Sequence, residues 1–416
     1  MKKTLVALAT LAVAAGASAQ VTISGYFGAS YDTFSISNAN ASRTGNTSET
    51  RISDQSSRII FGVSEDLGGG LKAIGQYDMR FNLDAAARSQ AEATTATTAA
   101  APGVGGANGL TNPTTNFSAG GNSHVGLSST SFGTVRLGRQ DMYYVDTPSL
   151  LPGGLYLAAN MVPVYHSLAN ANASRTPNVG WWTSNRINGF EGTVAYSTNP
   201  LRTSNTNEVE NDLGTANAQR KGSGYMLRLN YTNGPIDATL NTMDFKSDYI
   251  NGTAYTSNAG AGGAAVNGNA DQKGTNLVVK YAVNNQLKVA VGTNQGQTSA
   301  FSAAGAPAAV TKANAVAFSA SYDMGAWNFA MHQASRGNST VDGAESANTG
   351  LSITSLAATY NFSKRTAAGL MVTTLKADSG TKSALFYQSN NAYGGQMVGF
   401  NGETNNITSL ALRHNF

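Results

Sequence analysis

Apolar and polar residues alternate along most of the chain, and the 3.6-residue repeat of an amphipathic helix is nearly absent. In the segment 58–64, for example, Ile59, Phe61 and Val63 have one parity and Arg58 has the other. Successive side chains of a β-strand point to opposite faces, so the pattern predicts strands with one apolar and one polar face. The same alternation, with charges opposite the apolar stripe, recurs at 71–81, 225–231, 279–283, 287–291 and 410–416.

The connections between these strands alternate in length. Tight turns rich in Gly, Asn and Asp are predicted at 68–70, 129–132, 188–189, 233–235, 284–286, 323–325 and 363–364. Long polar stretches lie between them, at 38–54, 84–121, 140–175, 200–221, 250–272, 296–312, 336–349 and 375–402. Seven turns and eight loops connect sixteen strands. An even number of strands lets the first and the last pair and close the sheet. We therefore predict an all-β fold, a 16-stranded antiparallel up-and-down barrel.

Two other folds also contain alternating strands, namely a soluble β-sandwich and a secreted β-solenoid. A solenoid repeats with a fixed period, which this sequence lacks. A sandwich has short loops at both ends, which does not account for the alternation of short and long connections. The sequence favours the barrel over both alternatives.

The first nineteen residues have the pattern of an export signal. Lys2 and Lys3 precede an apolar stretch at 4–16, and Ala17-Ser18-Ala19 supplies the small residues of a cleavage site. We predict that residues 1–19 are a signal peptide that is removed, and that residues 20–416 form one barrel domain. The apolar stretch is too short to span the roughly 30 Å of hydrocarbon, and no later segment approaches about 20 apolar residues. A closed barrel satisfies its backbone groups in lipid, so the predicted barrel is a transmembrane one.

Composition excludes several classes of function. The 416 residues contain 12% charged residues, about half of the roughly 25% usual in soluble domains. There is no Cys, which excludes disulfides, a Cys-ligated metal and a Cys nucleophile. Without Lys2 and Lys3, the 27 basic residues become 25, against 23 acidic ones. This even balance gives no reason to expect nucleic acid as a partner.

The sequence contains none of the common catalytic patterns. None of the four His residues lies in an H-E-x-x-H motif, and the segment nearest to G-x-S-x-G, 121–125, lacks the last Gly. Within that segment Ser123 and His124 are neighbours on a strand and point to opposite faces. We therefore expect no enzymatic activity, no metal site and no cofactor.

The last predicted strand ends on an aromatic residue. Leu410, Leu412, His414 and Phe416 alternate up to the C-terminus. A terminal strand of this kind is suited to recognition, as a sheet edge, by the machinery that inserts barrels into the membrane. We predict that Phe416 is an assembly signal, with the barrel-assembly machinery and periplasmic chaperones as partners.

Several motifs are similar to those of one known family. Ser57-Arg58-Ile59 with the turn segment 65–73 resembles the second and third strands of its members, 133–140 resembles the fifth strand, and 412–416 resembles the terminal strand. The family is the general-diffusion trimeric porins of Gram-negative outer membranes, especially the neisserial and Burkholderia-like branch of the beta-proteobacteria. With the signal, the strand count and the loop order, the resemblance extends over the whole chain.

The resemblance implies a homotrimer in the outer membrane, in contact with lipid and lipopolysaccharide, that passes small hydrophilic solutes and ions. In such porins the third loop folds inward and places acidic groups opposite a basic wall. Carried over by motif, the pore constriction would consist of Arg58, Arg80, Arg136, Arg139, Asp141 and Asp146. Parity places further charges on the lumen wall, because a charge facing lipid at mid-bilayer costs roughly 2–4 kcal/mol. These are Lys72, Asp78, Arg228, Lys280, Lys288 and Arg413.

The sequence departs from the family pattern at the third loop and the sixth strand. Leu150 to Pro152 stand where an acidic residue is usual, and the sixth strand reads Gly180 to Thr183 where an Arg is usual. Arg175 and Arg186 are the nearest substitutes. The resemblance therefore carries over no ion preference. Three alternative functions also stay open: a substrate-specific channel, a non-channel surface protein such as an adhesin, and a barrel enzyme.

Overall fold

A computed structural model describes most of the predicted barrel. It covers residues 20–43, 46–55, 57–80, 83, 121–143, 164–166, 176–198, 222–247, 270–301, 307–384 and 398–416. The predicted signal peptide, 1–19, lies outside these residues, so its cleavage stays a prediction. Within the described ranges, no helix is long and apolar enough to cross a membrane.

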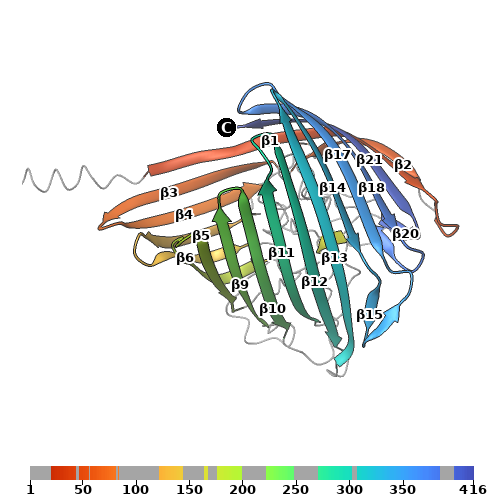
Figure 1. Cartoon of the computed structure of the whole chain (residues 1–416), viewed down its shortest axis with the longest axis horizontal. Coiled ribbons are helices and arrows are strands. Elements are labelled where there is room, and N and C mark those ends of the chain that lie inside the picture. Colours follow the sequence, from red (N-terminus) through yellow and green to blue (C-terminus); the bar gives the residue numbers. More distant parts are fainter. Residues whose placement is uncertain are drawn as a thin grey trace, which may run out of the picture.

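The chain folds into one large antiparallel sheet of long strands (Figure 1). Its strands are β1 (Gln20–Ser37), β2 (Ser48–Asp54), β3 (Arg58–Gly68), β4 (Leu71–Arg80), β5 (Ser123–Ser129), β6 (Gly133–Gln140), β7 (Thr176–Thr183), β8 (Phe190–Ser197), β9 (Gly222–Asn233), β10 (Ile236–Ser247), β11 (Ala270–Ala282), β12 (Leu287–Phe301), β13 (Pro307–Met324), β14 (Trp327–Arg336), β17 (Leu351–Asn361), β18 (Thr366–Ala377) and β21 (Thr404–Asn415). The remaining strands form two small hairpins in long connections: β15 (Ser339–Val341) with β16 (Ala344–Ser346), and β19 (Lys382–Ala384) with β20 (Val398–Asn401).

The sheet closes on itself. Each barrel strand pairs antiparallel with the next, and β1 pairs with β21 from Tyr26 opposite Asn415 to Ser37 opposite Thr404. β2 and β3 occupy one barrel position, because both pair with β1 and are separated only by a short interruption at 55–57. The barrel therefore has sixteen strands, as the sequence predicted.

The tight turns predicted from Gly, Asn and Asp agree well with the structure. The predicted long loops agree less well. All seven predicted tight turns connect neighbouring strands, and Asn188, Gly189 and Gly234 adopt positive φ within them. At the other end, the strands run further than predicted: β2 lies inside the predicted loop 38–54, and β12 and β13 extend into the predicted loop 296–312. The reason is compositional, since these segments lack a regular alternation of apolar and polar residues: β2 and the upper part of β12 are mostly polar, and β13 begins with the apolar run 307–310.

The C-terminal residue belongs to the closing ladder. The Phe416 amide donates to the Gly25 carbonyl at 3.1 Å, and the Gly25 amide donates to the Phe416 carbonyl at 3.2 Å. The Phe416 ring lies 5.1 Å from that of Phe27, between ring centroids. Gly25 must be a glycine, because a Cβ there would lie 2.2 Å from the carbonyl oxygen of Arg58. The terminal strand is thus paired to its last residue.

The first and the last long connections are joined across this closing seam. The Glu403 carboxylate accepts hydrogen bonds from the Asn40 amide at 2.9 Å, from Arg43 Nε at 2.8 Å and from the Phe400 amide at 2.6 Å. Arg43 Nη2 also forms an ion pair with the buried carboxylate at 2.5 Å. These bonds, chiefly the one from Arg43, lower the pKa of Glu403 to about 2 and raise the pKa of Arg43. We call this arrangement the seam clasp.

Deleting Phe416 is expected to lower the yield of folded barrel rather than the conductance of the barrels that do form. The deletion removes two backbone hydrogen bonds and the contact with Phe27. Heat-modifiable migration in SDS gels measures the folded fraction, and single-channel recording measures conductance. Phe416→Tyr is the matched control, because it keeps the backbone and an aromatic ring. A normal folded yield from the deletion variant would show that the residue is dispensable for assembly.

The seam clasp is expected to lose its contribution in strong acid. A carboxyl group whose folded pKa is depressed stabilises the fold above its unfolded pKa, which is about 4.3, and loses this effect as pH falls through the folded value near 2. Glu403→Gln should therefore lower the free energy of unfolding at pH 7 by about 1.5–3 kcal/mol. The difference from wild type should largely disappear near pH 2. Thermal unfolding of both proteins at the two pH values measures it, and an equal difference at both would contradict the assignment.

Candidate functional site

The third long connection, which follows β6, enters the barrel. Met142 and Tyr143 are fully buried. The Met142 carbonyl accepts hydrogen bonds from Arg228 Nη2 at 3.1 Å and from Asn241 Nδ2 at 3.2 Å, and Tyr143 Oη accepts one from Asn294 Nδ2 at 2.8 Å. These partners come from β9, β10 and β12, which lie three to six strands further along the barrel than β6. Residues 141–143 therefore lie in the lumen, and the face of the sheet that bears Asn241 and Asn294 is the inner one.

A second part of the same connection, Val164 to His166, contacts the same inner wall. Tyr165 Oη donates to Asn276 Oδ1 at 2.7 Å, and His166 Nδ1 lies 3.1 Å from Asn294 Nδ2. The rings of Tyr143 and Tyr165 pack edge-on against His166. The inward fold expected of the third loop is therefore seen at both of its described parts. Asp146 lies outside the described residues, so its place at the constriction stays a prediction.

Gly274 makes the close approach of the loop possible. A Cβ at this position of β11 would lie 2.6 Å from Cζ of Tyr143. Glycine inside a strand often marks such an approach of another part of the chain. The glycine within the strand was therefore a sequence signal that another part of the chain approaches here. It did not indicate that Tyr143 would be the residue in contact.

Two arginines on neighbouring strands share one carboxylate. Arg58 of β3 and Arg80 of β4 are cross-strand partners. Arg80 Nη2 lies 3.1 Å from Asp78 Oδ2, and Arg58 Nη1 lies 3.8 Å from the same oxygen. Asp78 was predicted as an ordinary lumen charge, but it is 3% exposed and lies between the two guanidinium groups. We call Arg58, Asp78 and Arg80 the arginine cluster.

Tyr26 extends the arginine cluster toward the closing strand. Arg58 Nη2 donates to Tyr26 Oη at 2.7 Å, and the guanidinium carbon of Arg413 lies 3.7 Å from the centroid of the Tyr26 ring. Tyr26 therefore faces the lumen, and it does not belong to the aromatic girdle that flanks the apolar band of outer-membrane barrels. The girdle forms instead from outward aromatic residues at the tight-turn end, including the contacts Phe190–Tyr231 and Trp327–Tyr360.

Asp141 is attached to the wall that bears the arginine cluster. Its Oδ2 accepts a hydrogen bond from Asn122 Nδ2 at 3.1 Å, and the Asn122 carbonyl accepts one from Gln76 Nε2 of β4 at 3.0 Å. The preceding Gly121 lies against Asp78, since a Cβ there would be 1.7 Å from Asp78 Oδ2. Asp141 thus lies on the side of β4 and β5, whereas the family pattern suggested an acidic group across the pore from the arginines.

A second basic region lies on the inner face of β6 to β9. Arg136 and Trp181 are cross-strand partners, and the guanidinium carbon of Arg228 lies 5.3 Å from the centroid of the Trp181 ring. Trp181 is a site residue that sequence reasoning missed. Of the two candidate substitutes for the missing sixth-strand arginine, Arg186 pairs with Glu191 at 3.6 Å beside a tight turn, and Arg175 lies outside the described residues. Arg228, from another strand, occupies the region instead.

The remaining predicted lumen charges lie nearer the tight-turn end. Lys280 pairs with Asp237 at 2.6 Å, Lys288 pairs with Asp323 at 3.3 Å, and Lys72 follows the turn between β3 and β4. Their parity is that of the inner face. Arg139 differs from the other arginines, because it lies at a β-bulge where the register with β7 shifts between Gly138 and Gln140. Arg139 has the same parity along the strand as Leu137 and the opposite parity to Arg136. It therefore does not continue the inward row of side chains to which Arg136 belongs.

Comparison with known proteins identifies the family. Residues 4–380 match the family model described as Gram-negative porin. The chain belongs to this family. Two relatives, the major outer membrane protein P.IB of two strains of Neisseria meningitidis serogroup B, are each 40% identical over 84 residues. That match covers 20% of this chain and spans only a quarter, 25%, of the relatives' length.

Solved structures with the same fold cover almost the whole chain. The anion-selective porin from Comamonas acidovorans is 20% identical over 96% of this chain and 100% of its own, with a TM-score of 0.63. The trimer form of OmpT from Vibrio cholerae is 10% identical over 96% and 100%, with a TM-score of 0.60. OmpF of Salmonella typhi is 14% identical over 96% and 98%, with a TM-score of 0.54. These identities show the fold alone. The outer membrane is the location of this porin, as the family and the Neisseria relatives indicate.

Removing the charge of Asp78 is expected to shift the channel toward anions. Asp78→Asn leaves Arg58 and Arg80 without the carboxylate that they share. Two unit charges interact by about 1 kcal/mol at 4 Å in bulk water, so the permeability ratio should change by up to about fivefold. The reversal potential in a salt gradient near 0.1 M measures this. Asp237→Asn, nearer the tight-turn end of the lumen, is the matched control, and equal effects of the two substitutions would contradict a special position for Asp78.

Proposed function

We propose that this porin is a passive, water-filled channel for small hydrophilic solutes and ions, that it works as a homotrimer, and that it has no enzymatic activity of its own. One observation carries the proposal: the third connection is anchored inside the lumen, through Met142, Tyr143 and Tyr165. A sixteen-strand barrel is wide enough for an aqueous channel. The described parts of the loop narrow such a channel. The homotrimer is supported by the fold shared with OmpT, for which a trimer form is known.

Selectivity in this proposal comes from charges on the wall beside the loop. The described charges of the site include five arginines, Arg58, Arg80, Arg136, Arg228 and Arg413, and three carboxylates, Asp78, Asp141 and Glu191, the last of which acts on Arg136. Fixed cations in a low-dielectric wall raise the local concentration of anions. We therefore propose a preference for anions at low ionic strength, a property that the Comamonas neighbour bears in its name. The aromatic faces of Tyr26 and Trp181 hold three of the arginines in place by cation–π contacts.

Conductance in a planar bilayer tests the channel itself. Purified trimers are expected to give stepwise, ohmic conductance, and a salt gradient is expected to give a reversal potential on the anion side. A protein that inserts as a folded barrel without conductance would contradict the proposed channel. Conductance that a single solute blocks at low concentration would instead indicate a substrate-specific channel.

The constriction is tested by charge changes at the predicted residues. Arg58→Glu and Arg80→Glu should move the reversal potential toward cations, whereas Asp141→Asn and Asp146→Asn should move it toward anions. Salt should reduce all four effects, because the Debye length falls from ~10 Å at 0.1 M to ~3 Å at 1 M. Lys288→Glu, near the tight-turn end, is the control and should have the smallest effect. Wild-type selectivity of all four variants at 0.1 M would show that the constriction is elsewhere.

A further inference from the structure

Four inward side chains on neighbouring strands form one row across the lumen wall. Arg228 of β9, Asn241 of β10, Asn276 of β11 and Asn294 of β12 are successive register partners. Neighbouring strands lie about 4.8 Å apart, so the row spans roughly 14 Å of the wall. The three asparagines are at most 3% exposed. We call these four residues the anchor row, because each of them bonds the third connection.

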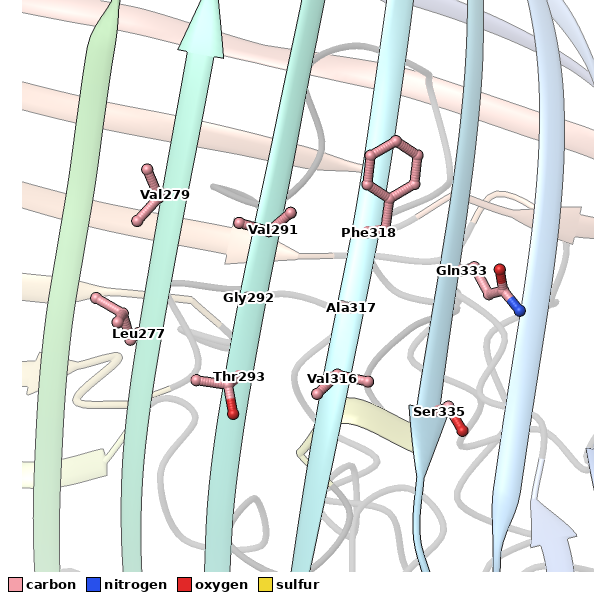
Figure 2. A pocket seen from close by; sticks show the side chains of 10 residues that line it. All are labelled: Leu277, Val279, Val291, Gly292, Thr293, Val316, Ala317, Phe318, Gln333 and Ser335. Carbon is pink, nitrogen blue, oxygen red and sulfur yellow. The ribbon is translucent and has the colours of Figure 1, made fainter.

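The chain neighbours of two asparagines define the direction in which the anchor row points. Leu277 follows Asn276 and Thr293 precedes Asn294, and both neighbours line an apolar groove on the outer face of the barrel (Figure 2). Successive side chains of a strand point to opposite faces. The anchor row therefore faces the lumen, and Thr293 offers a control position one residue away on the other face.

Arg228 is directed at the backbone of the third connection. Its Nη2 donates to the Met142 carbonyl at 3.1 Å, and Asn241 Nδ2 donates to the same carbonyl at 3.2 Å. The guanidinium carbon lies 5.3 Å from the centroid of the Trp181 ring. A planar guanidinium stacks on a ring and donates within its own plane at the same time, which a compact ammonium group does not do. Arg228 therefore uses the shape of its side chain as well as its charge.

Asn276 and Asn294 hold two tyrosines of the same connection, in opposite senses. Asn276 Oδ1 accepts a hydrogen bond from Tyr165 Oη at 2.7 Å, whereas Asn294 Nδ2 donates one to Tyr143 Oη at 2.8 Å. An asparagine side chain supplies both kinds of group and has no net charge. These two residues therefore fix the distance between the loop and the wall without adding a net charge to the channel.

The exposure of the wall residues shows on which side of the loop the water path lies. The side chains of Arg58 and Arg80 are 21% and 15% exposed, whereas Asn241 and Asn276 are 0% exposed. The third connection thus lies against the wall of the anchor row, and the wall of the arginine cluster stays accessible to water. A loop released from the anchor row would move toward the arginine cluster and into the water path.

We propose that the anchor row keeps the third connection out of the water path, and that Arg228 acts on permeation as a positioning residue of this loop. The proposal rests on the channel function proposed above and adds a division of roles to it. The arginine cluster sets the ion preference, and the anchor row sets the fraction of time for which the path is open. Loosening the anchor row is therefore expected to lower the mean conductance, although the loop it releases is the one that narrows the channel.

Single-channel recordings of the purified protein test the asparagines. Asn294→Leu removes the donor to Tyr143, and Thr293→Leu is the matched control on the outer face. One net hydrogen bond changes an equilibrium by roughly fivefold, so brief closures should become about five times as frequent in Asn294→Leu. The reversal potential in a salt gradient should stay that of wild type. Tyr143→Phe removes the same bond and keeps the ring, so adding it to Asn294→Leu should not make closures more frequent.

Arg228→Lys tests the role of the arginine, because it keeps the charge and loses the planar group. A positioning role predicts more frequent closures and a lower mean conductance, with the reversal potential unchanged. A role through charge alone predicts wild-type behaviour in all three measurements, and that result would overturn the proposal.

Three further results would also overturn it: a higher mean conductance of Asn294→Leu, equally frequent closures in Thr293→Leu and Asn294→Leu, or additive effects of Asn294→Leu and Tyr143→Phe. Heat-modifiable migration in SDS gels measures the folded fraction of each variant. If Asn294→Leu folds poorly, Tyr143→Phe alone decides the question, because it removes the bond and preserves the packing of the ring. A wild type without conductance would contradict the proposed channel, whereas a conducting wild type with unaffected variants would contradict only the role of the anchor row.

Discussion

The pairing of backbone groups in hydrocarbon is the constraint on which the other features of this porin depend. An unpaired amide or carbonyl costs several kcal/mol where no water can reach it, so a sheet in the membrane must have no free edge. The ladder between β1 and β21 satisfies this requirement, from Ser37 to the C-terminal Phe416. Once the sheet is closed, every strand has one face toward lipid and one toward the lumen. The position of each arginine, each apolar stripe and the third loop follows from that division.

Closure and parity also explain how much of the fold could be predicted from the sequence. Alternation is local, and so are the turn residues Asn188-Gly189 and Gly234, which adopt the backbone conformations that tight turns need. The number of strands and the inward parity of Arg58 and Arg80 therefore follow from short windows of sequence. The upper ends of β12 and β13 do not, because they rise beyond the hydrocarbon and water lies on both faces. Because both faces of the strand then contact the same solvent, the sequence has no reason to alternate apolar and polar residues there.

The site was less predictable because its contacts join distant parts of the chain. Asp78 occupies the space between Arg58 and Arg80 through the register of β3 with β4, which parity alone does not define. Trp181 and Arg228 meet across β8, and Tyr143 meets Asn294 across the lumen. Residue types gave partial signals, such as the glycine at 274 where the loop approaches. Which residue would approach could be learned only from the three-dimensional arrangement.

The closing ladder also determines when this protein can fold. Its rungs join residues that are almost the whole chain apart, and non-local contacts of this kind form slowly because the entropy of loop closure must be overcome first. Until β21 arrives, β1 is an open edge with unpaired donors and acceptors, and such edges are templates for aggregation. The barrel therefore closes only when β21 pairs with β1. A chain that lacks its last strand cannot form a closed sheet. The whole polypeptide must therefore stay unfolded and soluble until β21 can pair with β1.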